Sequence, residues 1–333
     1  MTLAERVTAI AALGFTERQA RFLATVLLHG GVCMDRHYCA FAGIAHGQKT
    51  TDFFAKLVDG RLAAAYVIGH RRARLFHLRN SVLYDAIGEP DNRFRKPVGM
   101  SVAIERLMVL DAVLGCRGVS WLATEREKVA HFSVLLRTRL AQNEFPHLRF
   151  GRGAATCVRF FPDKLPIGVV DEGREHVFGY LVKRSAPVDF RAFLRRHAEL
   201  LRALGRWVIR LWIPGHFRDS RDAYELAWRQ EYAAPLRLST ADELRWFFAQ
   251  RRARSGAGEK VGRESDRYAE AARAFGAPRY RALYRAWLRQ GGRALDAISS
   301  PALADAINRG AGRLEAELLP RRYLHLSSLV GTS

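Results

Sequence analysis

Cysteine is scarce in this sequence, and long apolar runs are missing. Only four cysteines occur among 333 residues, and none of them forms a CxxC pair. A disulfide framework is therefore not expected, which is typical of a protein of the reducing cytoplasm. No run of 18 apolar residues is present, so no transmembrane helix is expected. The N-terminal stretch carries an acid and lacks a cleavage motif, and we expect no signal peptide.

Other absences narrow the class of function. No glycine-rich phosphate loop follows a predicted strand, and no nucleophile–base pair stands out, so we expect no cofactor and no small-molecule ligand. Metal-binding side chains gather in sequence only at His29, Cys33, His37 and Cys39. Zinc ligands are usually more tightly paired, and two glycines interrupt any helix that would align the first three. We therefore expect no metal and interpret the cysteines as small buried hydrophobes.

Positive charge is in large excess. Lysine and arginine number 54 against 33 acidic residues, which gives a formal charge of +21 and a pI near 10.7. Only seven of the 54 are lysine. Codon usage in a GC-rich genome would explain why arginine is more frequent than lysine. It does not explain why basic residues outnumber acidic residues. A polyanionic partner is indicated, and nucleic acid is the commonest one.

Residues 16–79 show the element order of a winged helix. A helix opens at Thr16 and ends at Gly30-Gly31, a second spans 35–44, and a third spans 47–60. Two apolar strands, 62–68 and 73–79, follow and are joined by a basic turn. This plan docks its third helix in the DNA major groove, so double-stranded DNA is the expected partner.

Two sets of side chains form the predicted DNA contacts of this module. On the third helix, Phe53, Phe54 and Leu57 share one side, and Gln48, Lys49, Asp52 and Lys56 share the other. The hairpin contributes His70, Arg71, Arg72 and Arg74 at or near its tip. Gln and Lys can contact base edges or phosphate, and an acid can accept from cytosine. The alternative is a protein-interaction module whose charged helix face is merely solvated.

The rest of the chain is predicted to contain further helices and strands, so the predicted fold class is α+β with several domains. The predicted domains are 1–90 (winged helix), 91–145 (helical connector), 146–235 (mixed α/β) and 236–333 (basic helices). The connector is predicted to hold helices at 101–114 and 120–136, with Thr124 as an internal cap. Alternating apolar segments near 147–184 and 207–214 predict strands on either side of an amphipathic helix, 190–204.

Basic helices provide a second set of candidate phosphate contacts. In the helix 190–204, Arg191, Arg195 and Arg202 share one face. Between 245 and 293 there are thirteen Lys or Arg against four acids, among them Arg251, Arg252 and Arg254. Interleaved aromatics suit base stacking, although a helical bundle with an aromatic core is the favoured interpretation of the aromatics. A strongly basic surface predicts salt-sensitive binding.

The central segment resembles the core of the PD-(D/E)XK nuclease fold. Pro162-Asp163 precedes a strand, a hairpin leads to a second strand, and a helix follows. Active members carry an acid and a Lys two residues later on the second strand, and bind Mg²⁺ with the first acid. Here Lys183 has Leu181 in the place of that acid, and Glu175 lies too early. The predicted domain therefore has a nuclease-like fold without the chemistry, with Asp163 and Lys183 as weak catalytic candidates.

A winged helix followed by such a degenerate domain resembles the replication-relaxation family of bacterial plasmids and integrative elements. The resemblance spans residues of about 10–235 and implies a DNA-associated role in a mobile element. We expect a cytoplasmic transcriptional regulator without enzymatic activity, with a homodimer as an open option. Alternatives are a plasmid-type replication or transfer initiator, a Mg²⁺-dependent nuclease using Asp163 with Glu175 or Glu199, and an interaction module.

Overall fold

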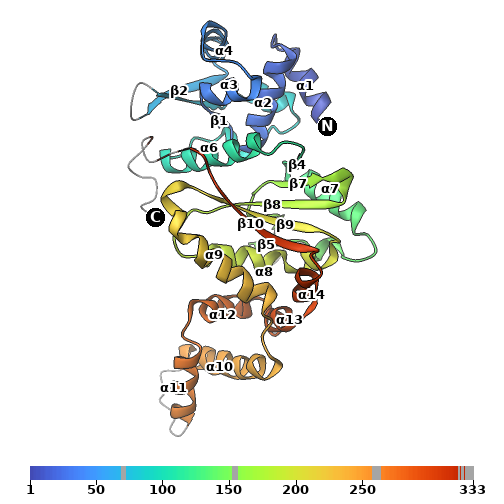
Figure 1. The fold of residues 1–333 in the computed structure, drawn as a ribbon, viewed down its shortest axis with the longest axis vertical. Coiled ribbons are helices and arrows are strands. Elements are labelled where there is room, and N and C mark those ends of the chain that lie inside the picture. Colours follow the sequence, from blue (N-terminus) through green and yellow to red (C-terminus); the bar gives the residue numbers. More distant parts are fainter. Residues whose placement is uncertain (69–72, 152–156, 257–263, 322, 324–325, 327–333) are drawn as a thin grey trace.

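The structure, a computed structural model, describes residues 1–68, 73–151, 157–256, 264–321, 323 and 326. Three parts follow one another along the long axis: a helical N-terminal module, a central sheet between helices, and a helical arm (Figure 1). The predicted α+β class is confirmed. No helix among the described ranges is both long and apolar enough to cross a bilayer.

The N-terminal module is built from short helices and one small sheet. Thr16 starts the second helix with a capping box, because its side chain accepts from Gln19 N–H while Gln19 bonds back to Thr16 N–H. Asn80 caps the last helix in the same region. The elements are α1 (Leu3–Ala11), α2 (Glu17–His29), β1 (Val32–Cys33), α3 (Asp35–Ala42), α4 (Gln48–Asp59), β2 (Ala63–Ile68), β3 (Ala73–Leu78) and α5 (Ser81–Ala86).

The small sheet has the order β1-β3-β2, with both pairings antiparallel. Strand β1 is only two residues long, and no periodic pattern predicted it. The module closes around aromatic side chains, in which Phe53 lies 4.5 Å from Tyr38 and Phe54 stacks on Phe76 at 4.2 Å between ring centres. These buried rings fix α4 against both α3 and the sheet.

Helix α6 (Met100–Gly115) joins the module to the central sheet. Its apolar side chains pack with Val32 and Leu75 of the module on one side and with Leu181 and Trp212 of the sheet on the other. Tyr323 and Leu326 complete the same cluster from the C-terminal segment. One continuous apolar core therefore connects parts that are far apart in sequence.

The central sheet has five strands in the order β10-β9-β8-β7-β4. Strands β8, β9 and β10 are parallel, whereas β7 is antiparallel to both β8 and β4. A separate antiparallel ribbon, β5–β6, lies beside the sheet. The strands are β4 (Ser120–Leu122), β5 (His147–Phe150), β6 (Cys157–Phe160), β7 (Ile167–Val170), β8 (Glu175–Leu181), β9 (Trp207–Ile213) and β10 (Gly312–Leu318).

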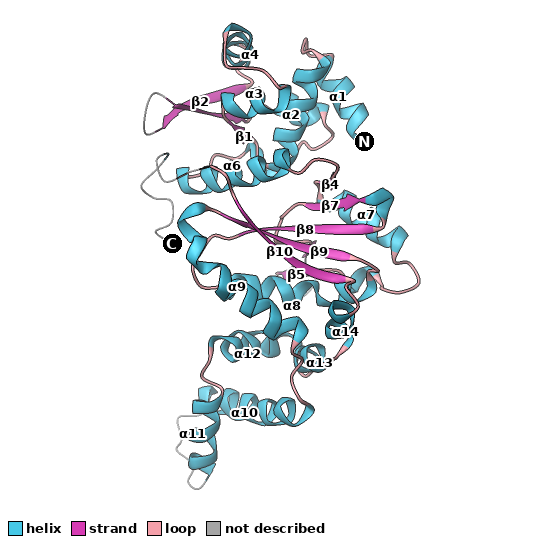
Figure 2. Ribbon diagram, viewed as in Figure 1, coloured by secondary structure: helices cyan, strands magenta, loops and turns pink. Residues whose placement is uncertain are grey.

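Helices cover both faces of this sheet (Figure 2). Phe178 and Tyr180 of β8 turn to the side of α8 (Val188–Ala203), and Leu181 turns to the side of α6. This alternation is the period-two pattern of a strand buried on both faces. Helix α8 is the crossover between the parallel strands β8 and β9, and α7 (Glu125–Leu135) also packs on its side of the sheet.

Two predicted helical regions contain strands instead. Ser120–Leu122 pairs with β7, so the predicted helix 120–136 begins only after Thr124, which is its N-cap. Gly312–Leu318, expected to be helical, is β10 and pairs in parallel with β9 over its whole length. Its Leu, Ala, Glu and Arg side chains favour helix intrinsically, and pairing with a buried strand overrides that preference.

The helical arm has its own small core. Phe247, Phe248, Leu283 and Leu295 meet in it, with Trp and Tyr side chains around them. A π-helical turn at Arg229–Ala233 and α14 pack on α8 and lead into and out of the arm. The helices are α9 (Arg221–Trp228), α10 (Leu238–Gly256), α11 (Glu264–Ala274), α12 (Pro278–Gln290), α13 (Arg293–Ser299) and α14 (Ala302–Asn308).

Candidate nucleic-acid interface

Helix α4 buries one side and exposes the other, as its sequence predicted. Thr50, Phe53, Phe54 and Leu57 are buried, and the residues between them are exposed. The helix starts at Gly47, whose lack of a side chain leaves the first turn uncapped by any side chain. It lies at one end of the molecule, away from the central sheet (Figure 1). Backbone N–H groups and polar side chains at its start are thus open to solvent.

The four α4 residues that are predicted to contact DNA differ in the interactions that they make within the protein. Gln48 donates to the Asp52 carboxylate over 2.5 Å, so these two side chains form a pair within the helix. Lys49 is exposed and makes no side-chain hydrogen bond or ion pair with any described residue. Lys56 donates to the Gly14 carbonyl, with its ammonium 4.8 Å from the Phe15 ring centre. Lys56 is therefore turned toward the α1–α2 turn.

Only part of the predicted hairpin contact can be located. His70, Arg71 and Arg72 lie outside the described residues. Arg74 is exposed on β3, and its guanidinium lies 5.3 Å from the Phe76 ring centre. Opposite Arg74 stands Val67, which is 75% exposed. The outer face of the hairpin therefore combines a cation with uncovered apolar surface.

Arg191 and Arg195 are not at the surface. Arg191 is 7% exposed and donates to the Glu231 carboxylate over 2.8 Å, and Arg195 reaches the same carboxylate over 3.1 Å. This ion-pair network ties α8 to the π-helical turn. The prediction that these two arginines contact phosphate is corrected, because burial and pairing use their charge inside the fold.

The other predicted arginines are divided between structural and solvent-facing positions. Arg202 bonds to Glu199 and to the Ala297 carbonyl, so it holds the arm against α8. Arg251 and Arg254 lie over the rings of Tyr284 and Tyr268, at 4.5 and 4.0 Å from the ring centres. Arg252 is fully on the exposed side of α10. Of these four, Arg252 is the one whose charge faces water freely.

Sequence reasoning missed a basic stripe on α12. Arg281, Arg285 and Arg289 follow at intervals of four residues and are all exposed. None of them has an ion pair with a described residue, and only Arg281 bonds, to the Gly276 carbonyl. The spacing puts the three cations about 6 Å apart along one helix face. The i, i+4 repeat of arginine was the signal that could have found it.

The His and Cys residues considered as metal ligands are dispersed. His37 Nδ1 accepts from the Met34 N–H, and its Nε2 lies 3.2 Å from the Asp111 carboxylate. Cys33 is fully buried, whereas Cys39 lies 3.5 Å from the Thr50 hydroxyl. His29 is buried beside Trp121. In the described part of the chain, no three His, Cys, Asp or Glu side chains gather as a metal site.

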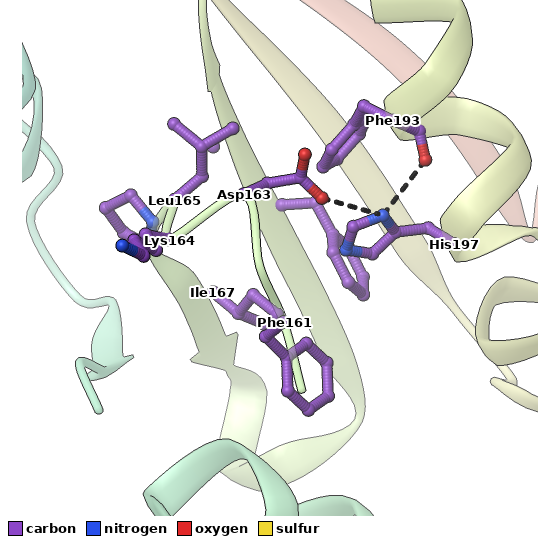
Figure 3. A pocket seen from close by; sticks show the side chains of 10 residues that line it. Phe161, Asp163, Lys164, Leu165, Ile167, Phe193 and His197 are labelled. Atoms are coloured by element: carbon purple, nitrogen blue, oxygen red, sulfur yellow. Dashed lines mark hydrogen bonds and ion pairs between the residues drawn. The ribbon is translucent and has the colours of Figure 1, made fainter. Parts of the chain in front are cut away.

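The two weak catalytic candidates lie on opposite faces of the sheet. Asp163 forms an ion pair with Arg196 of α8, whereas Lys183 lies 2.7 Å from Glu105 of α6. Asp163 points at His197, with 3.9 Å between Oδ2 and Nδ1 (Figure 3). The adjoining cavity has a volume of only about 10 Å³, which is barely enough for one water molecule. This arrangement does not bring Asp163 and Lys183 to one metal ion.

Titration of the histidine in this cavity is shifted by burial. His197 donates through Nδ1 to the Phe193 carbonyl over 3.0 Å. Burial lowers the pKa of His197 to about 4, although the nearby Asp163 carboxylate partly opposes this effect. The imidazole is therefore neutral at pH 7. His197 is therefore a neutral, packed imidazole beside the carboxylate that Arg196 pairs.

Comparison with known proteins yields no relative. No protein-family model, no curated protein and no solved structure matches the chain.

Proposed function

We propose that the protein binds double-stranded DNA through α4 and the β2–β3 hairpin. Support comes from the element order α2-β1-α3-α4-β2-β3 together with the sheet order β1-β3-β2, which is the plan of a winged helix. In that plan the helix before the hairpin enters the major groove and the hairpin meets the backbone. A formal charge of +21 adds long-range attraction to a polyanion.

The main support for the proposal is that α4 is packed firmly into the module on one side while its other side is exposed. Phe53 and Phe54 lock the helix into an aromatic core, so its orientation is rigid. Gln48, Lys49 and Asp52 are then exposed on α4, and this helix lies at the end of the molecule (Figure 1). A rigid helix that presents amide, ammonium and carboxylate groups suits contact with base edges.

We further propose that the central domain is a scaffold of nuclease-like fold without nuclease activity. The order Pro162-Asp163, β7, β8, α8 supports the resemblance in fold. The engagement of Asp163 by Arg196 and of Lys183 by Glu105 supports loss of the chemistry. Its role is to hold the DNA-binding module through the core around α6 and the basic arm through contacts with α8.

Within the DNA-binding class we propose a cytoplasmic transcriptional regulator of a mobile element, as the resemblance to the replication-relaxation family implies. Sequence-specific binding is what separates this role from a general DNA-coating role. Selection of bound duplexes from a random library should enrich one motif, and Gln48→Ala should alter that motif. Enrichment of no motif would contradict regulation by sequence recognition.

Binding of the full chain to fluorescent duplex DNA across a salt series tests the proposal. The variant Lys49→Ala/Arg71→Ala/Arg72→Ala should weaken binding and make the slope of log K against log salt less steep by about 0.9 for each lost phosphate contact. The matched control is Arg137→Ala/Arg139→Ala/Arg149→Ala, which removes three exposed arginines elsewhere. Equal losses in both variants would contradict recognition by the module.

The arm offers a separate comparison in the same assay. Arg281→Ala/Arg285→Ala/Arg289→Ala should lower affinity for all sequences equally if the α12 stripe contacts backbone phosphates, which carry no sequence information. A selective loss for one sequence would instead put specific contacts on the arm.

A further inference from the structure

The helical arm carries a row of exposed cations along one helix. Arg281, Arg285 and Arg289 of α12 follow one another at intervals of four residues, and all three are exposed. The helix has no acidic residue over its whole length. Because side chains four residues apart lie on the same face, the three guanidinium groups extend over about 12 Å of one helix side. These three residues are the α12 stripe.

The other side of α12 is anchored to the rest of the protein. Leu283 is buried in the core of the arm, and α12 packs on α8 of the central domain. Near the start of the helix, the Arg279 guanidinium donates to the Gln230 carbonyl in the π-helical turn. On the next helix, the Ala297 carbonyl of α13 accepts from Arg202 of α8. The α12 stripe is therefore held in place before any partner binds, which lowers the entropic cost of binding.

The charge of the α12 stripe is not neutralised by the protein. In the part of the chain that the structure describes, none of its three arginines forms an ion pair. Their one hydrogen bond runs from Arg281 Nε to the Gly276 carbonyl over 3.0 Å and leaves both terminal amino groups of that guanidinium free of partners among the described residues. Two carboxylates on adjoining helices, those of Asp242 and Asp296, are both paired with Arg245. The stripe therefore suits an anionic partner from solution.

The arm and α4 lie at opposite ends of the molecule. In Figure 1 the module that contains α4 is at one end of the long axis, the arm is at the other, and the central sheet lies between them. A DNA duplex is stiff over lengths of about 150 base pairs, and bending a short duplex by 40–90° costs roughly 1–6 kcal/mol. A short duplex that is bound at α4 is therefore not expected to fold back onto the arm.

We propose that the α12 stripe binds the phosphate backbone of a second DNA duplex, so that one chain bridges two duplexes. The inference rests on the proposed recognition of the first duplex by α4. Duplex DNA carries one negative charge for roughly every 1.7 Å of its axis, so three cations over about 12 Å face several phosphates. A guanidinium can contact two oxygens of one phosphate. Such contacts carry no sequence information, so the second duplex can have any sequence.

Capture of a fluorescent duplex by a second duplex that is fixed to beads tests the proposal with the full chain. Duplexes of roughly 20 base pairs are short enough to resist bending around the protein. The wild type should carry the fluorescent duplex to the beads. Its affinity for that second duplex should fall about 40-fold between 50 and 200 mM salt, as expected for three phosphate contacts. The variant Arg281→Ala/Arg285→Ala/Arg289→Ala should lower capture roughly tenfold or more at low salt while keeping its Tm.

Two matched variants show whether the α12 stripe itself is responsible. Lysine at the same three positions keeps the charge and should keep capture, because lysine also binds phosphate as a point charge. The control Arg137→Ala/Arg139→Ala/Arg149→Ala removes three exposed arginines of the central part and should capture like the wild type. The proposal is overturned if the alanine variant of the stripe captures as much as the wild type, or if the control loses as much.

Binding of a single duplex separates this inference from the proposed role of α4. The variant Lys49→Ala/Arg71→Ala/Arg72→Ala should weaken binding of the first duplex, and capture should fall with it. If the wild type binds one duplex in this way but captures no second duplex, bridging is overturned and recognition by α4 stands. If the α4 variant binds and captures like the wild type, no duplex is held at α4 and both proposals are overturned.

Discussion

Arg36 of α3 and Asp111 of α6 form a two-pronged ion pair, with 2.6 Å between Nη1 and Oδ1 and 2.8 Å between Nη2 and Oδ2. The Tyr323 hydroxyl donates to the same carboxylate over 2.8 Å. One carboxylate thus connects the N-terminal module, the linking helix and the C-terminal segment. Because α3 precedes α4 directly, this pair also fixes the base on which the proposed DNA-contacting helix stands.

Replacing Asp111 by Asn should destabilise the protein by about 2–4 kcal/mol, because Arg36 would stay largely buried without its partner charge. Urea denaturation at pH 7 measures the change. Asp85→Asn, at an exposed carboxylate without an ion pair among the described residues, is the control and should change stability by less than about 0.5 kcal/mol. Similar effects of the two substitutions would show that the Arg36–Asp111 pair contributes little.

The effect of Asp111→Asn on stability should depend on pH. Burial alone would raise the pKa of Asp111, but hydrogen bonds from His37 and Arg36 hold it well below its usual value. Its stabilisation is therefore complete above the unfolded pKa near 3.9 and is lost as pH falls below that value. The difference between wild type and Asp111→Asn should shrink below pH 4. A difference that stays constant down to pH 2.5 would contradict the lowered pKa.

His197 should make the protein sensitive to mild acid. Burial lowers its pKa to about 4, while the unfolded chain titrates near 6.5. Between these values only the unfolded state binds the proton, so stability falls by about 1.4 kcal/mol per pH unit from this group. His197→Gln should be less stable at pH 7 but show a shallower decline from pH 6.5 to 4.5. Parallel declines in urea titrations would exclude His197 as the cause.

Breaking the buried network at Glu231 should have a large effect. Glu231→Gln leaves Arg191 and Arg195 buried without a counter-ion and should cost about 3–5 kcal/mol. The surface pair of Arg221 and Glu225 supplies the control, and Glu225→Gln should cost less than about 1 kcal/mol. Chemical denaturation compares the two variants. Equal costs would mean that the burial of the first network does not matter.

Gly179 of β8 is packed against Trp212 of β9. A Cβ at this position would lie 2.2 Å from the indole ring, so Gly179→Ala should destabilise the sheet by about 1–3 kcal/mol and shift tryptophan fluorescence. Gly205→Ala is the control, because no atom lies within 4 Å of its added Cβ. A fluorescence spectrum and Tm equal to those of the control would show that the sheet adjusts without cost.

Local patterns predicted most of the N-terminal module. The helix start at Thr16, apolar periodicity and turn glycines each act within a few residues, and the structure has helices and strands where they indicated. Strand β1 was missed because two residues show no period. Strand β10 was missed because its pairing with β9 depends on residues that lie about a hundred positions earlier.

The candidate site was predictable only where exposure follows from helix periodicity. The outer face of α4 could be assigned this way, and the structure has Gln48, Lys49 and Asp52 exposed. Charge alone could not show that Arg191 and Arg195 are held in ion pairs inside the fold and are not free to contact phosphate. Their partner carboxylate, Glu231, lies on another element.

The position of β10 in the chain determines when the central sheet can be completed. Between β9 and β10 the chain makes α9 and the whole helical arm, so a ribosome synthesises the arm before the fifth strand emerges. During that interval β9 is an open edge, and Trp207, which later packs on Gly312, has no cover there. Uncovered strand edges recruit chaperones or other strands. We therefore expect that shielding of the half-built sheet during translation favours production of this protein.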